Sequence, residues 1–162
     1  MRTPINLLAT LAIIAGIASV PRTASGDKPP RAIVVVVAKG SPVRSLSRAE
    51  LRRCFTGDAL VVEDVRLIPF NFPPGTPERI AFDQVVLGMS AEEVGRFWVD
   101  RKIRGESQAP RSLPTALHVT KVVAKFPGAI SYVPIDQLTD DVVAVAIDGV
   151  LPSSPAYPIR LR

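Results

Sequence analysis

The stretch AIVVVVAKGSPVRSLSRAELRRCFTG, residues 32–57, contains the elements from which the fold class can be predicted. Residues 32–38 form a continuous apolar, mostly β-branched run, which is typical of a strand covered on both faces. The Gly and Pro within residues 39–42 end that strand in a turn. A helix is expected from Ser47 to about Phe55. A covered strand followed by a turn and a helix indicates an α/β protein.

The helix in this stretch carries its own start and stop signals. Ser47 and Glu50 have the spacing of a capping box, in which each side chain satisfies a backbone amide of the first turn. Gly57 is the expected stop. Cys54 lies on the same helix face as Leu51, so we expect it to be buried as a small apolar residue and not to act as a redox thiol.

Helices and strands are expected to alternate through the rest of the chain. Further strands are expected at residues 65–70, 129–133 and 142–147, and an edge strand in the tail. The N-caps of the further helices are expected to be Thr76, Ser90 and Ser112. The last helix is expected to bury the stripe Ala116, Val119, Val123 and Phe126. Residues 101–111 are polar and basic and indicate a loop. This alternation favours a mixed, mostly parallel sheet flanked by helices.

The first residues have the layout of a secretory signal peptide. Arg2 supplies an early positive charge, residues 7–20 are largely apolar, and residues 23–26 are small enough for cleavage. An uncleaved anchor is the alternative, although the apolar run is shorter than the roughly 20 residues of a membrane span. We expect a signal peptide at 1–26, a linker at 27–31 and one domain at 32–162, located in the periplasm or secreted.

The sequence lacks the residue combinations of common enzyme classes. His118 is the only His and Cys54 the only Cys, so neither a zinc spacing nor an ordinary catalytic triad is present. There is no glycine-rich nucleotide motif. The acidic pairs at 92–93 and 140–141 fit a helix start and a turn. The net charge of +5 is mild and not clustered, which suits a small anion better than nucleic acid. We expect no enzyme activity, no cofactor and no metal.

Several segments, in order, resemble one known family. Residues 32–57 are similar to the strand, turn and helix of the phosphate-binding periplasmic proteins of ABC transporters. PPGTPERIAFDQVVLG, residues 73–88, resembles their phosphate turn and helix, and KFPGAISYVP, residues 125–134, resembles a strand that they share. Residues 140–162 resemble their C-terminal end. The resemblance implies a type II periplasmic-binding-protein-like lobe, in a chain about half the size of a full binding protein.

The resemblance also implies a ligand, phosphate or another small oxyanion, and a place for it. In the family, Ser, Gly and Thr of the turn donate to the anion, and an Arg four residues before the Ser pairs with it. Here Pro74 occupies the Ser position and Phe70 the Arg position, so a hydroxyl, an amide donor and a cation are missing. Gly75, Thr76 and Arg79 remain as candidate ligand-binding residues.

Two functions stay open at this point. The first is a secreted or periplasmic substrate-binding-protein-like domain with weak phosphate or oxyanion binding. A helix start favours an exposed anion by only about 0.3–1 kcal/mol, whereas micromolar affinity needs about 8 kcal/mol. The alternative is an interaction or structural module that kept the lobe, lost the ligand, and assembles with a protein partner or a second copy. No nucleic-acid partner is expected, and membrane contact only through an uncleaved leader.

Overall fold

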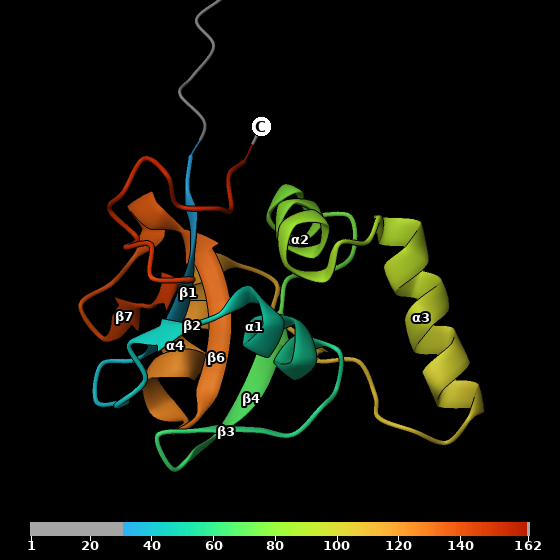
Figure 1. Cartoon of the computed structure of the whole chain (residues 1–162). Helices are drawn as coiled ribbons and strands as arrows, with labels where there is room; N and C mark the ends of the chain where they lie inside the picture. The colour runs from blue at the N-terminus through green and yellow to red at the C-terminus, as the bar shows by residue number, and fades with distance from the viewer. Residues whose placement is uncertain (1–30, 162) are drawn as a thin grey trace, which may run out of the picture.

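The computed structural model describes residues 31–161. The expected signal peptide at 1–26 and all of the expected linker except Arg31 lie outside the described residues. A mixed sheet forms the centre, with α1 in front of it and α4 behind it in the view of Figure 1. Within residues 31–161, no helix is long and apolar enough to cross a bilayer.

The strand predicted from the opening stretch is β1 (Ile33–Ala38), and it lies inside the sheet. Residues 33–37 are fully buried, as a strand covered on both faces requires. β1 runs antiparallel to both of its neighbours, β6 (Ala129–Pro134) and β7 (Val142–Ala144).

Parallel pairing occurs further along the sheet, where β4 (Val65–Asn71) lies beside β6. The strand order is β3-β4-β6-β1-β7, in which β3 is Leu60–Val62 and antiparallel to β4. The short strand β5 (Arg111–Ser112) is parallel to β4. The α/β class and the mixed sheet are therefore confirmed, with the parallel pairs concentrated around β4.

The strand expected at residues 142–147 is in fact two strands. β7 ends at Ala144, and the chain then leaves β1 to form β8 (Ala146–Ile147), which is parallel to β2 (Ser45–Leu46). Val145 joins them and still donates its amide to the carbonyl oxygen of Val35 at 2.8 Å. The tail forms an isolated antiparallel bridge, Arg160 to Ala32, in place of the expected edge strand.

The helix starts follow the capping signals closely. α1 (Arg48–Phe55) and α3 (Ala91–Ile103) both begin with complete capping boxes, at Ser47 and Ser90. α2 (Pro77–Phe82) is capped by Thr76 and continues as a π-helical segment, η1 (Asp83–Leu87), before Gly88 ends it. The remaining helices are α4 (Ala116–Lys125) and the short 3₁₀ segment η2 (Ile135–Gln137).

Three local expectations were wrong. Thr115, not Ser112, caps α4, because Ser112 is held in β5 and the next amide, of Leu113, donates to the Asn71 carbonyl oxygen at 2.7 Å. The loop expected from residue 101 begins later, since α3 continues to Ile103. Phe126 is 57% exposed because it is the C-cap of α4, with an extended backbone that turns it out of the apolar stripe.

Candidate functional site

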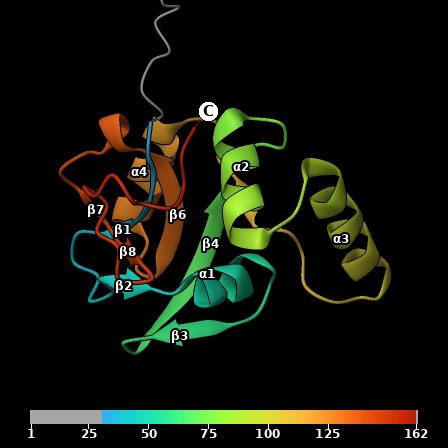
Figure 2. The same cartoon turned by 45° about the horizontal axis from the view of Figure 1, so that its top comes forward.

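The turn that resembles a phosphate turn lies between β4 and α2, at the end of the sheet where the described chain also begins and ends. β4 and β6 are parallel, and the end of β6 at Pro134 pairs with the start of β1 at Ile33. The C-terminal segment joins this edge, because Ile159 accepts the amide of Ile33 at 3.0 Å. Figures 1 and 2 show both ends of the described chain on the same side as α2.

Gly75 forms the exposed tip of the turn. Its φ of +85° is in the left-handed region, which glycine adopts without strain. A Cβ added to Gly75 would meet nothing within 4 Å, so the backbone conformation and not close packing favours glycine here. The Gly75 amide has no hydrogen-bond partner among residues 31–161. It is therefore a backbone donor that an anion in solution could reach.

Thr76 has the capping role expected from the sequence. Its hydroxyl oxygen accepts the Arg79 amide at 3.4 Å, and the same hydroxyl donates to the Pro73 carbonyl oxygen at 3.0 Å. Pro77 follows at the first helical position, where its missing amide costs no hydrogen bond. The hydroxyl hydrogen of Thr76 is thus used inside the turn.

Arg79 does not lie beside Gly75 and Thr76 on the surface. Its side chain is buried beneath the turn, with Nε 2.5 Å from Asp83 Oδ2 and Nη1 donating to the Phe72 carbonyl oxygen at 3.3 Å. Burial raises the pKa of Asp83, and the charge and hydrogen bond of Arg79 oppose that rise. Arg79 therefore stabilises the turn from its buried side, while Gly75 and Thr76 form its outer side.

The base of the turn is a buried aromatic cluster. Tyr132 of β6 stacks on Phe82 of α2, with ring centroids 4.0 Å apart and planes 6° apart. Phe72 contacts the same tyrosine ring at 5.5 Å, and Phe55 packs on Phe82 at 4.6 Å. The Tyr132 hydroxyl donates to Asn71 Oδ1 at 3.1 Å. This cluster fixes the end of β4 and the start of α2 relative to the sheet.

Sequence reasoning missed Asp83 as the partner of Arg79. The signal was present, since residues four apart on a helix face each other and an Arg–Asp pair at that spacing is a common ion pair. The first-turn carboxylate Glu78 is also part of the site environment. A negative charge at this position opposes the approach of an anion to the helix start.

The other reactive side chains lie away from the turn. Cys54 is fully buried, and burial raises the pKa of its thiol to about 12, which supports its interpretation as a core residue. His118 is on the exposed side of α4, and its Nδ1 lies 2.8 Å from the Thr115 hydroxyl oxygen. Among residues 31–161, no group of three or more His, Cys, Asp or Glu side chains is arranged to hold a metal ion.

Comparison with solved structures finds proteins of similar fold. The structure is similar to an ABC-type phosphate transport receptor from Vibrio cholerae, with a TM-score of 0.63 and 16% identity over 76% of this chain. A phosphate ABC transporter substrate-binding protein from Clostridium perfringens, with bound phosphate, matches at TM-score 0.63 and 21% identity over 81% of the chain. PstS from Borrelia burgdorferi matches at TM-score 0.63 and 10% identity over 82%.

The resemblance read from the sequence is thus confirmed at the level of the fold. The chain spans about half the length of these neighbours, since the matches cover 49%, 53% and 55% of them. No protein-family model matches the chain. No curated protein matches it either. The neighbours are transport receptors and substrate-binding proteins, not enzymes.

Proposed function

We propose that the protein is an exported, non-enzymatic substrate-binding-protein-type lobe, acting in the periplasm, that contacts phosphate or a related oxyanion weakly through the Gly75 amide, in the turn that Thr76 caps. The observation that carries the proposal is the unpartnered Gly75 amide at the tip of a strand–turn–helix segment. Backbone amides at such a turn are suited to anion oxygens. The phosphate-binding names of the structural neighbours support the choice of ligand.

The geometry favours weak binding. Pro74 and Pro77 have no amide hydrogen, and the Thr76 amide and hydroxyl both donate to the Pro73 carbonyl oxygen, at 3.3 Å and 3.0 Å. Arg79 is paired with Asp83, so its role at the turn is structural: it donates a hydrogen bond to the Phe72 carbonyl oxygen. Without a free cation or several convergent donors, an affinity near the millimolar level, about 4 kcal/mol, is the reasonable expectation.

Titration with inorganic phosphate, followed by amide chemical shifts, tests this function. We expect saturable shifts of the Gly75 and Thr76 amides in the millimolar range, with sodium chloride of equal ionic strength as the reference. Thr76→Val removes the cap and should weaken binding. Thr115→Val is the matched control, because Thr115 caps α4 in the same way. Unchanged Gly75 and Thr76 amides at about 50 mM phosphate would rule out this function.

The second candidate is an interaction module that kept the lobe and lost the ligand. The buried Arg79–Asp83 pair favours it, because a cation that is 6% exposed and already paired is not available to a ligand. The same titration separates the two candidates. A folded protein whose turn amides do not respond to phosphate is the result that this second function predicts.

A further inference from the structure

A cavity lies in a gap along the edge of the sheet, beside β4. On this edge β3 pairs with residues 65–67 of β4 and β5 pairs with residues 70–71, so residues 68 and 69 lie between the two. The cavity has a volume of about 430 Å³, and its walls are β4, residues 57–59 after α1, and the segment that leads into β5. It is separate from the 71–76 turn, none of whose residues line it.

In this gap β4 offers no backbone amide to a ligand. Pro69 has no amide hydrogen, and the Ile68 amide donates to the Gly128 carbonyl oxygen at 2.8 Å, on the other side of β4. A peptide that added a strand to the sheet here would find no donor on these two residues. A ligand in the gap is therefore recognised at β4 through side chains.

Two arginines flank apolar side chains on one face of β4. Arg66, Ile68 and Phe70 alternate along the strand and so point to the same face, opposite to the buried Leu67. Arg111 is the partner of Phe70 in the register of β5 and shares that face. Ile68 is 48% exposed, and all of these residues line the cavity. The face presents an apolar strip with a guanidinium group at each end.

Neither of these guanidinium groups is used inside the fold. The side chains of Arg66 and Arg111 are exposed and make no hydrogen bond or ion pair within residues 31–161. Asp58 is the one acidic residue that lines the cavity, and its carboxylate lies 3.4 Å from Arg53 Nε, which offsets its charge. The cavity therefore has an excess of positive charge.

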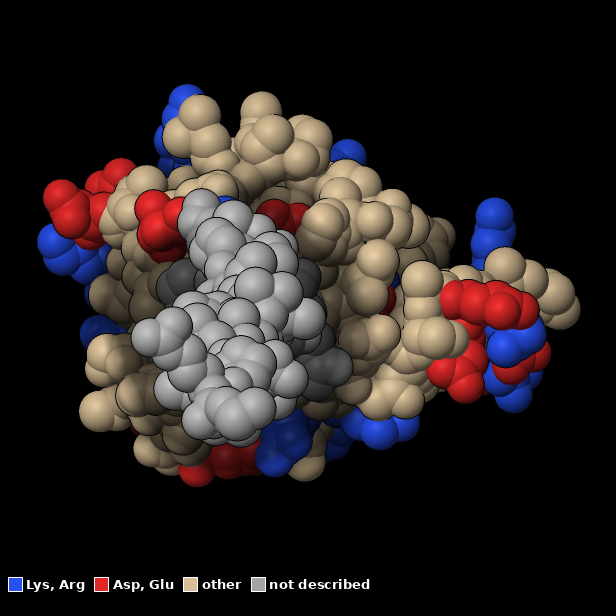
Figure 3. All heavy atoms as spheres, turned by 90° about the horizontal axis from the view of Figure 1, so that it is seen from above, with Lys and Arg blue, Asp and Glu red and all other residues tan. Residues whose placement is uncertain are grey.

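Arginines in the preceding helix are paired, unlike Arg111. Arg101 Nε lies 3.1 Å from Glu106 Oε2, and Arg104 pairs with Asp100. Figure 3 shows acidic and basic side chains side by side on the projecting part at the right, where α3 lies. Arg111 thus differs from these two arginines in having no acidic partner within the described chain.

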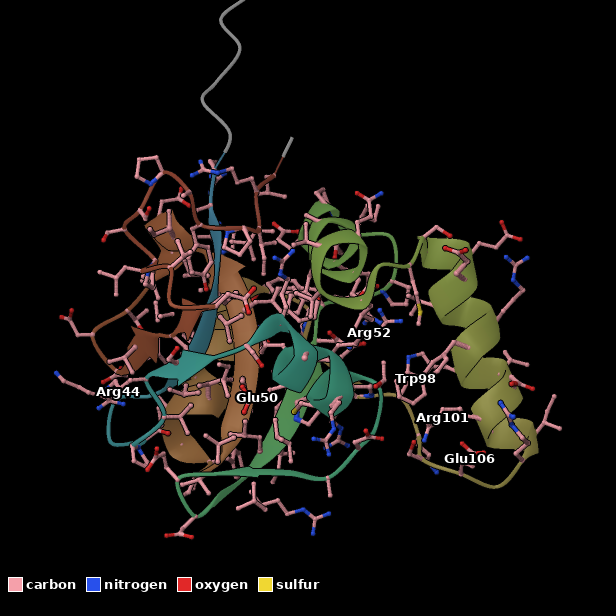
Figure 4. The ribbon with its side chains drawn as sticks, in the orientation of Figure 1. Arg44, Glu50, Arg52, Trp98, Arg101 and Glu106 are labelled. Carbon is pink, nitrogen blue, oxygen red and sulfur yellow. The ribbon has the colours of Figure 1, made fainter. Side chains whose placement is uncertain are left out.

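The inner wall of the cavity is closely packed. Gly57 has a φ of +99°, and a Cβ added there would clash with Ser107 Oγ, so the segment before β5 packs directly on the end of α1. Trp98 lies 3.4 Å from the same position, and Figure 4 shows it pointing from α3 toward the rest of the protein. A cavity whose wall is already fixed favours binding, because little order has to be created when a ligand enters.

We propose that this cavity binds a small dicarboxylate with an aliphatic spacer, with one carboxylate on Arg66, the other on Arg111 and the spacer over Ile68. A guanidinium group matches the planar geometry of a carboxylate. The two arginines start about 14 Å apart, from four residues of strand and one strand spacing. Two separated carboxylates suit that span better than one compact anion. The inference does not depend on whether the Gly75 amide binds phosphate.

Titration with adipate, followed by amide chemical shifts, tests this site. We expect saturable shifts of the Ile68, Phe70 and Arg111 amides, with sodium chloride of equal ionic strength as the reference. Hexanoate has the same chain length and one carboxylate, so it should bind at least about tenfold more weakly, because one charge-assisted contact is lost. Inorganic phosphate has no spacer and should shift these amides less than adipate does.

Matched substitutions locate the two carboxylates. Arg66→Gln and Arg111→Gln should each remove the preference for adipate over hexanoate. Arg52→Gln is the control, because the Arg52 side chain, labelled in Figure 4, is also exposed and unpaired and lies outside the cavity. It should leave both affinities unchanged. Circular dichroism checks that each variant remains folded.

Three results would overturn the proposal. The first is the absence of saturable shifts of the Ile68, Phe70 and Arg111 amides at about 50 mM adipate. The second is a preference for adipate that survives both Arg66→Gln and Arg111→Gln. The third is inorganic phosphate that shifts these amides as strongly as adipate, because the apolar spacer would then have no part in recognition.

Discussion

Arg79 Nε lies 2.5 Å from Asp83 Oδ2, and the two side chains are 7% and 3% exposed. This ion pair joins α2 to the first residue of the π-helical segment η1. Asp83 neutralises the charge of Arg79, which contacts the 71–76 turn. The Gly75 amide is then the backbone donor that faces the solvent. The pair therefore explains why this turn, which resembles a phosphate turn in sequence, is proposed to bind phosphate only weakly.

The first prediction concerns this pair. Asp83→Asn should destabilise the protein by about 3–5 kcal/mol, because Arg79 would remain buried without a counter-charge. The double change Arg79→Met with Asp83→Leu should cost less than Asp83→Asn alone. Urea unfolding followed by circular dichroism measures both. Asp100→Asn is the control, since Asp100 pairs with Arg104 at the same spacing while 62% exposed, and it should cost about 0.5 kcal/mol or less.

The parts of the fold that could be predicted from the sequence are those decided by neighbouring residues. The capping boxes at Ser47 and Ser90 are complete within four residues, and both are present as expected. The orientation of β1 could not be predicted in this way. A strand covered on both faces has the same apolar run whether its neighbours are parallel or antiparallel. The direction depends on β6 and β7, about 100 residues further along the chain.

The candidate site was predictable to a similar extent. Thr76 as N-cap and Gly75 at the bend follow from local turn chemistry, and both are found in the structure. The burial of Arg79 goes with its hydrogen bonds to the Phe72 carbonyl oxygen and to Asp83, and residue spacing does not reveal the first of these. Whether Gly75, Thr76 and Arg79 contact a ligand stays a prediction.

The second prediction concerns Cys54. Burial raises the pKa of its thiol to about 12, so very little reactive thiolate exists near pH 8. We expect the native protein to react with a disulfide reagent far more slowly than the same protein in concentrated denaturant. The release of the coloured thiol product measures both rates. Rapid, stoichiometric labelling of the native protein would contradict the buried position of Cys54.

The third prediction contrasts two glycines. Gly128 has a φ of +82°, and a Cβ there would lie 2.2 Å from the Arg66 carbonyl oxygen. Gly128→Ala should therefore cost at least about 1–3 kcal/mol. Gly95→Ala should instead stabilise the protein by about 1 kcal/mol, because it is within α3 and has open space around it. Thermal unfolding of dilute samples compares the stabilities of the two variants. Equal effects of the two substitutions would contradict the difference in free space around Gly128 and Gly95.

The last prediction concerns the contact between Arg48 at the start of α1 and Asp148 in the turn after β8. The pKa of the Asp148 carboxyl is lowered, first because the Arg48 amide donates to Oδ1 at 2.9 Å, and then because Arg48 Nε donates to Oδ2 at 2.8 Å. A carboxyl whose pKa is lower in the folded state stabilises the fold above its unfolded pKa. That contribution is lost as the pH falls through the folded pKa.

Asp148→Asn isolates the charge in this contact. Asp148 has a φ of +50° and precedes Gly149 in the turn, and Asn is accepted in that conformation at least as well as Asp. The free energy of unfolding of the wild type should exceed that of Asp148→Asn above about pH 5, and the difference should shrink to nearly zero by about pH 2. Asp64→Asn, at a φ of +61° in another turn, controls for the substitution itself. A difference that stays constant over this range would mean that Asp148 acts through its shape and not its charge, because an uncharged contribution does not titrate.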